Sequence, residues 1–149
     1  MRILILSFYF EPDLSAGSFR MAGLVQALQR QIGTDVRIDA LTTQPNRYAS
    51  YSQDALPKEE LGAVTVRRFA LPAHRNGFLD QARAFATFAY QVIRATRGSQ
   101  YDLVFATSSR LFSAALGAFV ALRMRAPLYL DIRDIFVDTL QDVLSPLAA

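Results

Sequence analysis

The first twenty residues, MRILILSFYFEPDLSAGSFR, set narrow limits on the fold of this chain. A short and nearly all-apolar run from Arg2 to Phe8 is typical of a strand buried on both faces of a parallel sheet. A polar, turn-rich loop from Glu11 to Gly17 follows, and Ser18 precedes a stretch with helical spacing. A strand, a glycine-containing loop and a helix N-terminus bring unpaired backbone N–H groups to one place, which favours a phosphate or another anion there.

The rest of the chain repeats this alternation of strand and helix patterns. Helical spacing predicts helices over Ser18–Gln31, Phe78–Thr96 and Arg110–Met124, and an amphipathic segment over Ile135–Leu144. Strands are expected over Val36–Leu41, Val64–Phe69, Tyr101–Thr107 and Leu128–Leu130. No regular pattern spans Gln44 to Leu61, which predicts a long loop. The order β-α-β-β-α-β-α-β-α predicts an open α/β sheet in a single domain of 149 residues.

The buried faces of two helices can also be predicted. The second helix is expected to bury a stripe at helical spacing that consists of Leu79, Ala82, Phe85, Ala89, Val92 and Ile93. The third helix is apolar nearly all round and is expected to be buried. The opposite side of the second helix carries Arg83, Tyr90, Arg94 and Arg97. This side could contact anionic lipid, and a face exposed to solvent is the alternative interpretation.

Composition excludes several classes of function. The chain has no cysteine, which rules out disulfides, thiolate metal sites and a cysteine nucleophile. Its net charge of +3 is too small and too scattered to predict a nucleic-acid partner. No apolar run is long enough to span a membrane, and the N-terminus lacks the features of a signal peptide. A soluble, cytoplasmic protein is therefore expected, with a peripheral contact at the inner face of the cell membrane left open.

Ligands of open α/β sheets bind outside the carboxyl ends of the strands. Four polar segments fall at those ends here: Phe8–Arg20, Thr42–Asn46, Thr107–Arg110 and Asp131–Asp134. In the first segment Gly17 would allow close approach of a phosphate, and Arg20 would supply the counter-charge. The loop has neither the G-x-G-x-x-G pattern nor a Gly-Lys-Ser/Thr sequence, and an ordinary strand-to-helix connection is the alternative.

Two carboxylates mark the end of the last predicted strand. Asp131 and Asp134 flank Arg133, an arrangement that suits acid/base work or a metal, whereas aspartates that begin a helix are the simpler interpretation. His74, the one histidine, falls in a loop. Ser108 and Ser109 lack the nucleophile-elbow pattern, which disfavours a hydrolase.

Four of these segments together resemble a known family. YFEPDLSAGSFR, LTTQPN, DLVFATSSRLF and LYLDIRDIF, in this order and spacing, resemble the N-terminal half of family 4 glycosyltransferases of the GT-B fold. The likeness is to the branch that builds bacterial surface polysaccharides, and it covers Arg2 to about Leu144. It implies a Rossmann-like, open, mostly parallel sheet with helices on both faces, which is the acceptor-side half of a GT-B enzyme.

The resemblance also implies an activity and a set of site residues. Members transfer a sugar with retention from a nucleotide-sugar to a saccharide or lipid-linked saccharide acceptor, generally without a metal or other cofactor. Ala16, Gly17 and Arg20 match the loop that approaches the donor diphosphate and sugar. Asp134 matches an acid near the donor sugar, with Asp131 as a second candidate catalytic group. Ser108 and Arg133 match further positions on the donor side.

The sequence departs from the family pattern at several points. One glycine stands where many relatives have two, Ser108-Ser109-Arg110 replaces Ser-Pro-Pro, and Phe136-Val137 replaces Trp-Pro. Arg133 occupies the position of a histidine found in many members. The C-terminal domain that would hold the nucleotide is expected beyond Ala149, so residues 1–149 are expected to be inactive alone. The alternative is a stand-alone flavodoxin-like or nucleotide-binding module without catalysis.

Overall fold

The structure, a computed structural model, describes residues 1–32, 35–45, 55–72, 78–108 and 111–132. Along the chain the elements follow the order β1-α1-β2-β3-β4-α2-β5-α3-β6. The strands are β1 (Arg2–Leu6), β2 (Arg37–Thr43), β3 (Lys58–Leu61), β4 (Val64–Phe69), β5 (Leu103–Thr107) and β6 (Leu128–Asp131). The helices are α1 (Ala16–Ile32), α2 (Phe78–Ala95) and α3 (Leu111–Met124). The predicted segment Ile135–Leu144 lies outside the described residues.

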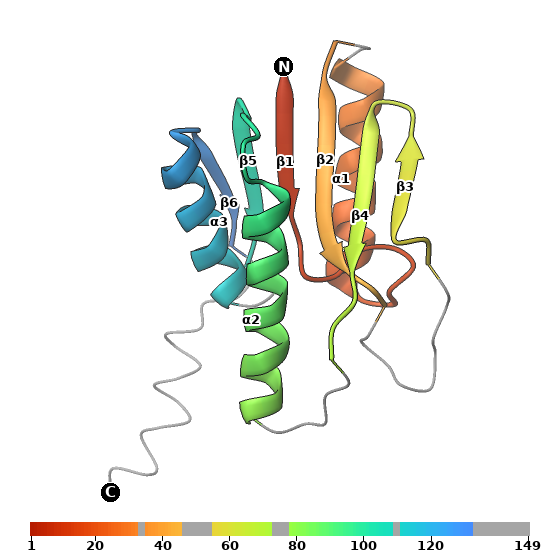
Figure 1. The fold of residues 1–149 in the computed structure, drawn as a ribbon. Coiled ribbons are helices and arrows are strands. Elements are labelled where there is room, and N and C mark those ends of the chain that lie inside the picture. The colour runs from red at the N-terminus through yellow and green to blue at the C-terminus, as the bar shows by residue number, and fades with distance from the viewer. Residues whose placement is uncertain (33–34, 46–54, 73–77, 109–110, 133–149) are drawn as a thin grey trace, which may run out of the picture.

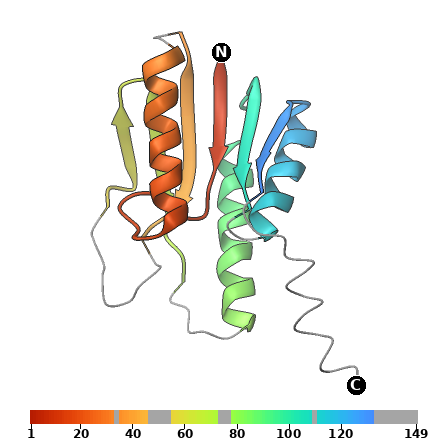
Figure 2. The ribbon, with the colours of Figure 1, turned by 180° about the vertical axis from the view of Figure 1, so that it is seen from behind.

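The six strands form one open sheet in the order β3-β4-β2-β1-β5-β6. Every neighbouring pair is parallel except β3 and β4. Figures 1 and 2 show α1 on one face of the sheet and both α2 and α3 on the other. This arrangement confirms the predicted Rossmann-like α/β fold.

The alternation of side chains along β1 divides the core into two layers. Ile3 and Ile5 pack with residues of α1, including Met21 and Val25. Leu4 and Leu6 point to the other face and pack with α2 and α3. Because β1 lies in the middle of the sheet and is covered on both sides, its sequence is a continuous apolar run.

The first helix begins two residues earlier than the sequence predicts. The Oγ atom of Ser15 accepts a hydrogen bond from the backbone N–H of Ser18 at 3.1 Å, and the Ser15 carbonyl accepts one from Phe19 at 3.1 Å. Ser15 is therefore the N-cap, and the expectation that Ser18 precedes the helix is wrong. Consequently Gly17 belongs to the first turn of α1 rather than to the loop.

The predicted loop from Gln44 to Leu61 contains a short strand. β3 pairs antiparallel with β4 at the edge of the sheet, and the turn between them has Gly62 at a φ of 63°. Its sequence, Lys58-Glu59-Glu60-Leu61, is charged and lacks apolar alternation, so periodicity gives no strand signal. Charged side chains are common on edge strands because they discourage pairing with another chain.

Two expectations about helix burial are correct only in part. In α2 Val92 is buried, and Phe85, Ala89 and Ile93 pack partly buried against the core, as expected. The Leu79 side chain, however, is 80% exposed and Ala82 is exposed as well, and Ala84 and Phe88 take their place in the core. In α3 the side chains of Phe112, Phe119 and Leu122 are exposed. Burial depends on which neighbour covers a helix, and an all-round apolar sequence does not specify that neighbour.

One face of α3 lies unusually close to β5. A Cβ atom added to Gly117 would lie 2.3 Å from the Cβ atom of Ala106. Glycine at this position permits the close approach of the helix to the sheet. Among the described residues, no helix is both long and apolar enough to cross a membrane.

Candidate functional site at the carboxyl edge of the sheet

Side chains from β2 fix the chain where it leaves β1. The Oγ1 atom of Thr43 donates a hydrogen bond to the carbonyl of Phe8 at 2.7 Å. The Oγ atom of Ser7 donates to the carbonyl of Tyr9 at 2.6 Å. Phe8 and Tyr9 are buried, and their rings meet edge to face. The backbone that leads into the Glu11–Gly17 segment is therefore anchored by hydrogen bonds and by aromatic packing.

Arg68, from the end of β4, ties the next part of this connection to the sheet. It is buried, and its Nε and Nη2 atoms donate to the carbonyl of Glu11 at 3.1 and 2.8 Å. Its Nη1 atom donates to the carbonyl of Leu56 at 3.1 Å and lies 2.9 Å from Glu59 Oε2. A planar guanidinium can hold several acceptors at once, which suits it to joining β3, β4 and the loop.

The N-terminus of α1 lies beyond this anchored loop. The first backbone N–H groups of a helix have no acceptor within the helix. In α1 the N–H of Ser18 is satisfied, because Ser15 Oγ accepts its hydrogen bond. Ala16 and Gly17 form the rest of the first turn, and Gly17 is buried. The helix has no acidic side chain in its first turn. No acidic side chain from the first turn of α1 therefore offsets the positive end of the helix dipole at this edge of the sheet.

Arg20 and Asp131, both predicted site residues, form a bidentate ion pair. Arg20 Nε lies 3.1 Å from Asp131 Oδ2, and Arg20 Nη2 lies 2.8 Å from Asp131 Oδ1. The Asp131 side chain is 9% exposed and that of Arg20 is 63% exposed. The pair connects the first turns of α1 to the end of β6. It leaves further N–H donors of the Arg20 guanidinium available, while both carboxylate oxygens of Asp131 already accept a hydrogen bond.

Ser108, a third predicted site residue, is joined to the same point. Its backbone N–H donates to the carbonyl of Asp131 at 2.9 Å, immediately after β5, and the residue is buried. Two buried hydroxyls also lie at this edge of the sheet, that of Ser18 at the start of α1 and that of Thr107 at the end of β5. Neither hydroxyl has a hydrogen-bond partner among the described residues.

The structure therefore brings together part of the predicted set. Arg20, Asp131 and Ser108 meet at the carboxyl edge, next to the helix that begins at Ala16 and Gly17. Three other candidates, His74, Arg133 and Asp134, lie outside the described residues.

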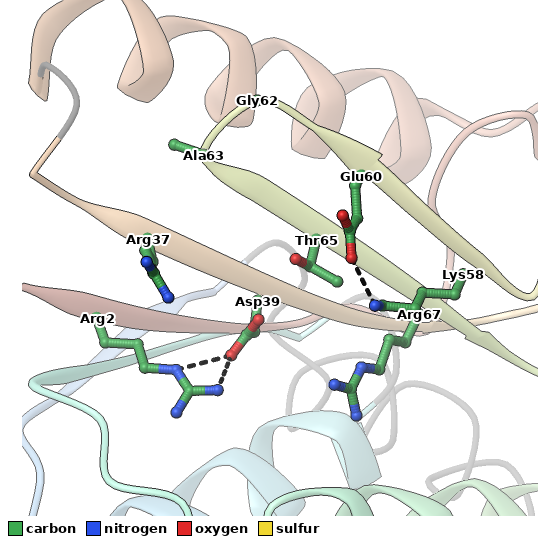
Figure 3. A pocket seen from close by; sticks show the side chains of 9 residues that line it. All are labelled: Arg2, Arg37, Asp39, Lys58, Glu60, Gly62, Ala63, Thr65 and Arg67. Atoms are coloured by element: carbon green, nitrogen blue, oxygen red, sulfur yellow. Dashed lines mark hydrogen bonds and ion pairs between the residues drawn. The ribbon is translucent and has the colours of Figure 1, made fainter.

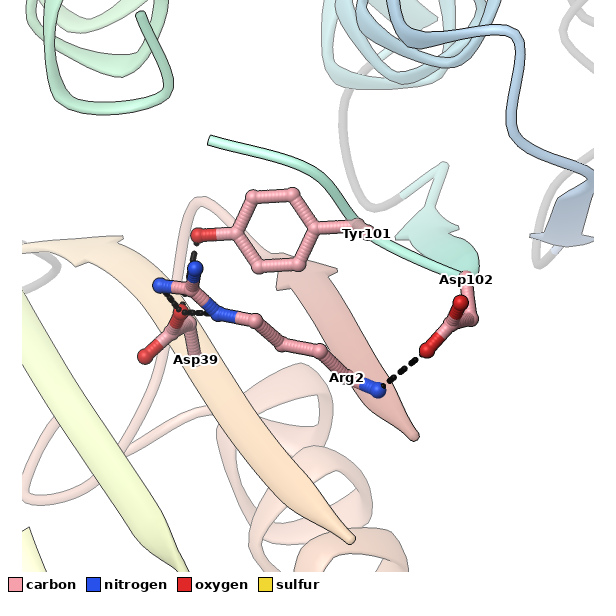
Figure 4. A network of polar contacts seen from close by, with 4 residues as sticks. All are labelled: Arg2, Asp39, Tyr101 and Asp102. Carbon is pink, nitrogen blue, oxygen red and sulfur yellow. Dashed lines mark hydrogen bonds and ion pairs between the residues drawn. The ribbon is translucent and has the colours of Figure 1, made fainter. Parts of the chain in front are cut away.

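Sequence reasoning missed a polar network at the opposite end of the strands. Asp39 Oδ2 accepts hydrogen bonds from Arg2 Nε at 2.9 Å, from Arg2 Nη2 at 2.6 Å and from the Tyr101 hydroxyl at 2.8 Å (Figure 4). The Arg2 guanidinium also lies 4.6 Å from the centre of the Tyr101 ring, in cation–π geometry. The sequence did contain a signal for this network, because Asp39 lies within the buried strand β2 and a buried carboxylate needs hydrogen-bond partners.

The network changes the proton affinity of two of its members. Burial raises the pKa of Tyr101 to about 12, and its hydrogen bond to the Asp39 carboxylate acts in the same direction. Burial acts to lower the pKa of Arg2, but the hydrogen bond to Asp39 and the nearby Tyr101 and Asp39 charges outweigh it, so that the pKa is raised. Arg2 is therefore held as a cation.

Comparison with known proteins supports the fold. No family model and no curated protein sequence matches the chain. Two crystal structures of the C-terminal domain of a hydrogenase from Pyrococcus furiosus match with TM-scores of 0.57 and 0.59, at 22% and 20% identity. Each match covers 87% of this chain and 89% of the hydrogenase chain. At these identities the likeness shows a shared fold alone.

A third match is to part of a larger protein. A UGT transferase from Siraitia grosvenorii, solved in complex with UDP, matches with a TM-score of 0.45 and 14% identity. The match covers 87% of this chain and 27% of the transferase. A likeness at this level carries no argument about activity.

Proposed function

We propose that this chain is the N-terminal, acceptor-side domain of a retaining glycosyltransferase of GT-B type, active in the synthesis of a surface polysaccharide. The observation that carries the proposal is the Arg20–Asp131 ion pair beside the first turn of α1. It joins residues from two of the four segments that resemble family 4 transferases, YFEPDLSAGSFR and LYLDIRDIF. Residues of the other two, Thr43 and Ser108, support the same edge through hydrogen bonds.

The proposed chemistry takes place in a cleft between this edge and a second domain. The backbone N–H groups of Ala16 and Gly17 and the positive end of α1 would meet the diphosphate of a nucleotide-sugar. Arg20, oriented by Asp131, would add a fixed cation to that side of the donor. Asp134 is the proposed acid near the sugar, with Arg133 on the donor side. No metal or other cofactor is required in this scheme, since arginine and the helix N-terminus supply the positive charge.

The acceptor is proposed to be a saccharide, free or linked to a lipid. Exposed side chains on α2, including Arg83, Tyr90 and Arg94, would suit contact with an anionic membrane surface. Sedimentation with vesicles tests this part separately. We expect more protein to pellet with vesicles that contain phosphatidylglycerol than with pure phosphatidylcholine, and less with the Arg94→Glu variant. Equal pelleting with both vesicles would contradict the membrane contact.

Turnover measurements test the site in the protein that contains this chain together with a donor-binding domain. Nucleotide release is followed with a panel of UDP-, GDP- and TDP-hexoses, in the presence of free and lipid-linked saccharides as acceptors for the transferred sugar. We expect Gly17→Val to lower the turnover rate by more than its loss of unfolding free energy would explain. The reason is that a branched side chain in the first turn of α1 would keep the diphosphate away. Asp134→Asn is expected to do the same by removing the acid.

A matched control comes from the same helix. Gly23 is exposed, and apart from its chain neighbours and the backbone of its own helix no atom lies within 4 Å of the position of an added Cβ atom. Gly23→Ala should therefore leave turnover unchanged. Unchanged turnover in both Gly17→Val and Asp134→Asn would remove the site assignment. Absence of nucleotide release with every donor in the panel would contradict the transferase proposal itself.

A further inference from the structure

A second group of charged residues lies on the half of the sheet that α2 leaves open. Arg2, Asp39 and Arg67 point to the α2 side of the sheet, because they alternate with residues that face α1. In both views β3 and β4 stand clear of α2 (Figures 1 and 2). A pocket of about 710 Å³ opens there (Figure 3). Its lining residues are Arg2, Arg37, Asp39, Lys58, Glu60, Gly62, Ala63, Thr65 and Arg67.

The register of the strands places like charges opposite each other in this pocket. Arg2 on β1 is in register with Arg37 on β2, and Lys58 on β3 is in register with Arg67 on β4. Like charges directly opposite on one face of a sheet repel each other. Two such cationic pairs in one pocket destabilise the sheet when no anion is present. A bound anion would offset this repulsion.

The carboxylates of the pocket neutralise only part of this charge. Asp39 is engaged by Arg2, and Glu60 is engaged by Lys58. The guanidinium groups of Arg37 and Arg67 have no hydrogen-bond or ion-pair partner within the part of the chain that the structure describes. Two cations from neighbouring strands therefore face the pocket with their donors unused.

Arg2 is also fixed in place. Its Nε and Nη2 atoms are held by Asp39 Oδ2, and its guanidinium lies against the ring of Tyr101 (Figure 4). A guanidinium that is already oriented loses little conformational freedom when an anion binds to its remaining donors. The arrangement thus supplies one oriented and two unpartnered arginines on the same side of the sheet.

We propose that this pocket binds the phosphate or pyrophosphate group of a small molecule. Arginine forks match phosphate oxygens in pairs of hydrogen bonds. The pocket falls in the range of about 300–1,000 Å³ that is typical of small-molecule sites. Gly62, Ala63 and Thr65 offer little apolar surface, so the rest of the ligand is polar. The pocket runs along the sheet from Arg2 and Arg37, where β1 and β2 begin, to Arg67, which is in register with Leu41 of β2. It lies on the α2 side of the sheet, whereas Arg20 and Asp131 lie on the α1 side with Ile3 and Leu24.

Calorimetric titration of residues 1–149 with pyrophosphate at low ionic strength tests the proposal. Arg37→Gln and Arg67→Gln are each expected to weaken binding about tenfold, which corresponds to about 1.4 kcal/mol. The matched control is Arg30→Gln, an exposed arginine of the last turn of α1, which removes the same charge outside the pocket. It should change the affinity less than about twofold.

Thermal unfolding provides a readout that does not depend on the strength of binding alone. Without pyrophosphate, Arg67→Gln should unfold at the same temperature as the wild type or a higher one, because the change removes one repulsive pair. Pyrophosphate should raise the unfolding temperature of the wild type and of Arg30→Gln, and much less that of Arg67→Gln. No saturable binding, or an equal loss of affinity in Arg30→Gln and Arg67→Gln, would overturn the proposal.

Discussion

Alkaline pH should weaken the folded state through one residue, Tyr101. The pKa of its hydroxyl is raised from 10.0 to about 12 in the folded protein, first by burial and then by the hydrogen bond to Asp39. A group with a raised pKa in the folded state contributes stability that is complete below its unfolded pKa and is lost as the pH rises towards its folded pKa. The affected window is therefore between about pH 10 and about pH 12.

The size of the effect follows from the shift. Between about pH 9 and about pH 11 the unfolded phenol becomes largely ionised while the folded one stays protonated, which costs the wild type about 1 kcal/mol of unfolding free energy. Tyr101→Phe lacks the ionisable hydroxyl, so its unfolding free energy should fall by about 1 kcal/mol less than that of the wild type over the same pH interval. At neutral pH the variant is expected to be less stable by about 1 kcal/mol, because one buried hydrogen bond is missing.

Urea unfolding at the two pH values, followed by circular dichroism, measures the difference. Tyr129→Phe serves as the control, since Tyr129 is exposed and its ring stacks on Phe105. It should respond to pH as the wild type does. If the wild type and Tyr101→Phe lose the same stability between the two pH values, the buried network of Tyr101, Arg2 and Asp39 does not exist as described.

Two further predictions concern packing and the carboxyl edge. Arg20→Ala should lower the unfolding free energy by about 1–2 kcal/mol, because it leaves the buried Asp131 carboxylate without its partner. A double-mutant cycle of Arg20→Ala with Asp131→Asn should give a coupling free energy of at least about 0.5 kcal/mol. A coupling near zero would argue against the ion pair. Gly117→Ala should destabilise by about 1–3 kcal/mol through contact with Ala106, whereas Gly23→Ala should stabilise by about 0.5–1 kcal/mol. Equal unfolding temperatures for the two glycine variants would contradict the close packing of α3 on β5.

The sequence was sufficient to predict the fold because each central strand has a clear pattern. β1 and β5 are continuous apolar runs, and α1 has regular helical spacing, so the order of elements and the parallel sheet could be inferred. β3 could not be found this way, because Lys58, Glu59 and Glu60 carry no apolar alternation. That strand exists through its pairing with β4, which is a property of tertiary structure.

The candidate site was predictable only in part. Parallel strands bring their carboxyl ends to one edge, which is why Arg20, Asp131 and Ser108 could be expected near each other. The bidentate pairing of Arg20 with Asp131 depends on the angle between α1 and the sheet, which a local pattern does not contain. The network around Asp39 joins residues from three separate strand starts, so no local motif marks it.

The first turn of α1 is central to the proposed donor site, and its backbone amides can be observed directly. Residues 1–149 labelled with ¹⁵N are titrated with UDP and with GDP, and with uridine and guanosine as controls without the diphosphate. We expect weak binding in which the amide signals of Ala16 and Gly17 shift with UDP and GDP and not with either nucleoside. Signals of Ala16 and Gly17 that stay in place, or that move equally with the nucleosides, would contradict it.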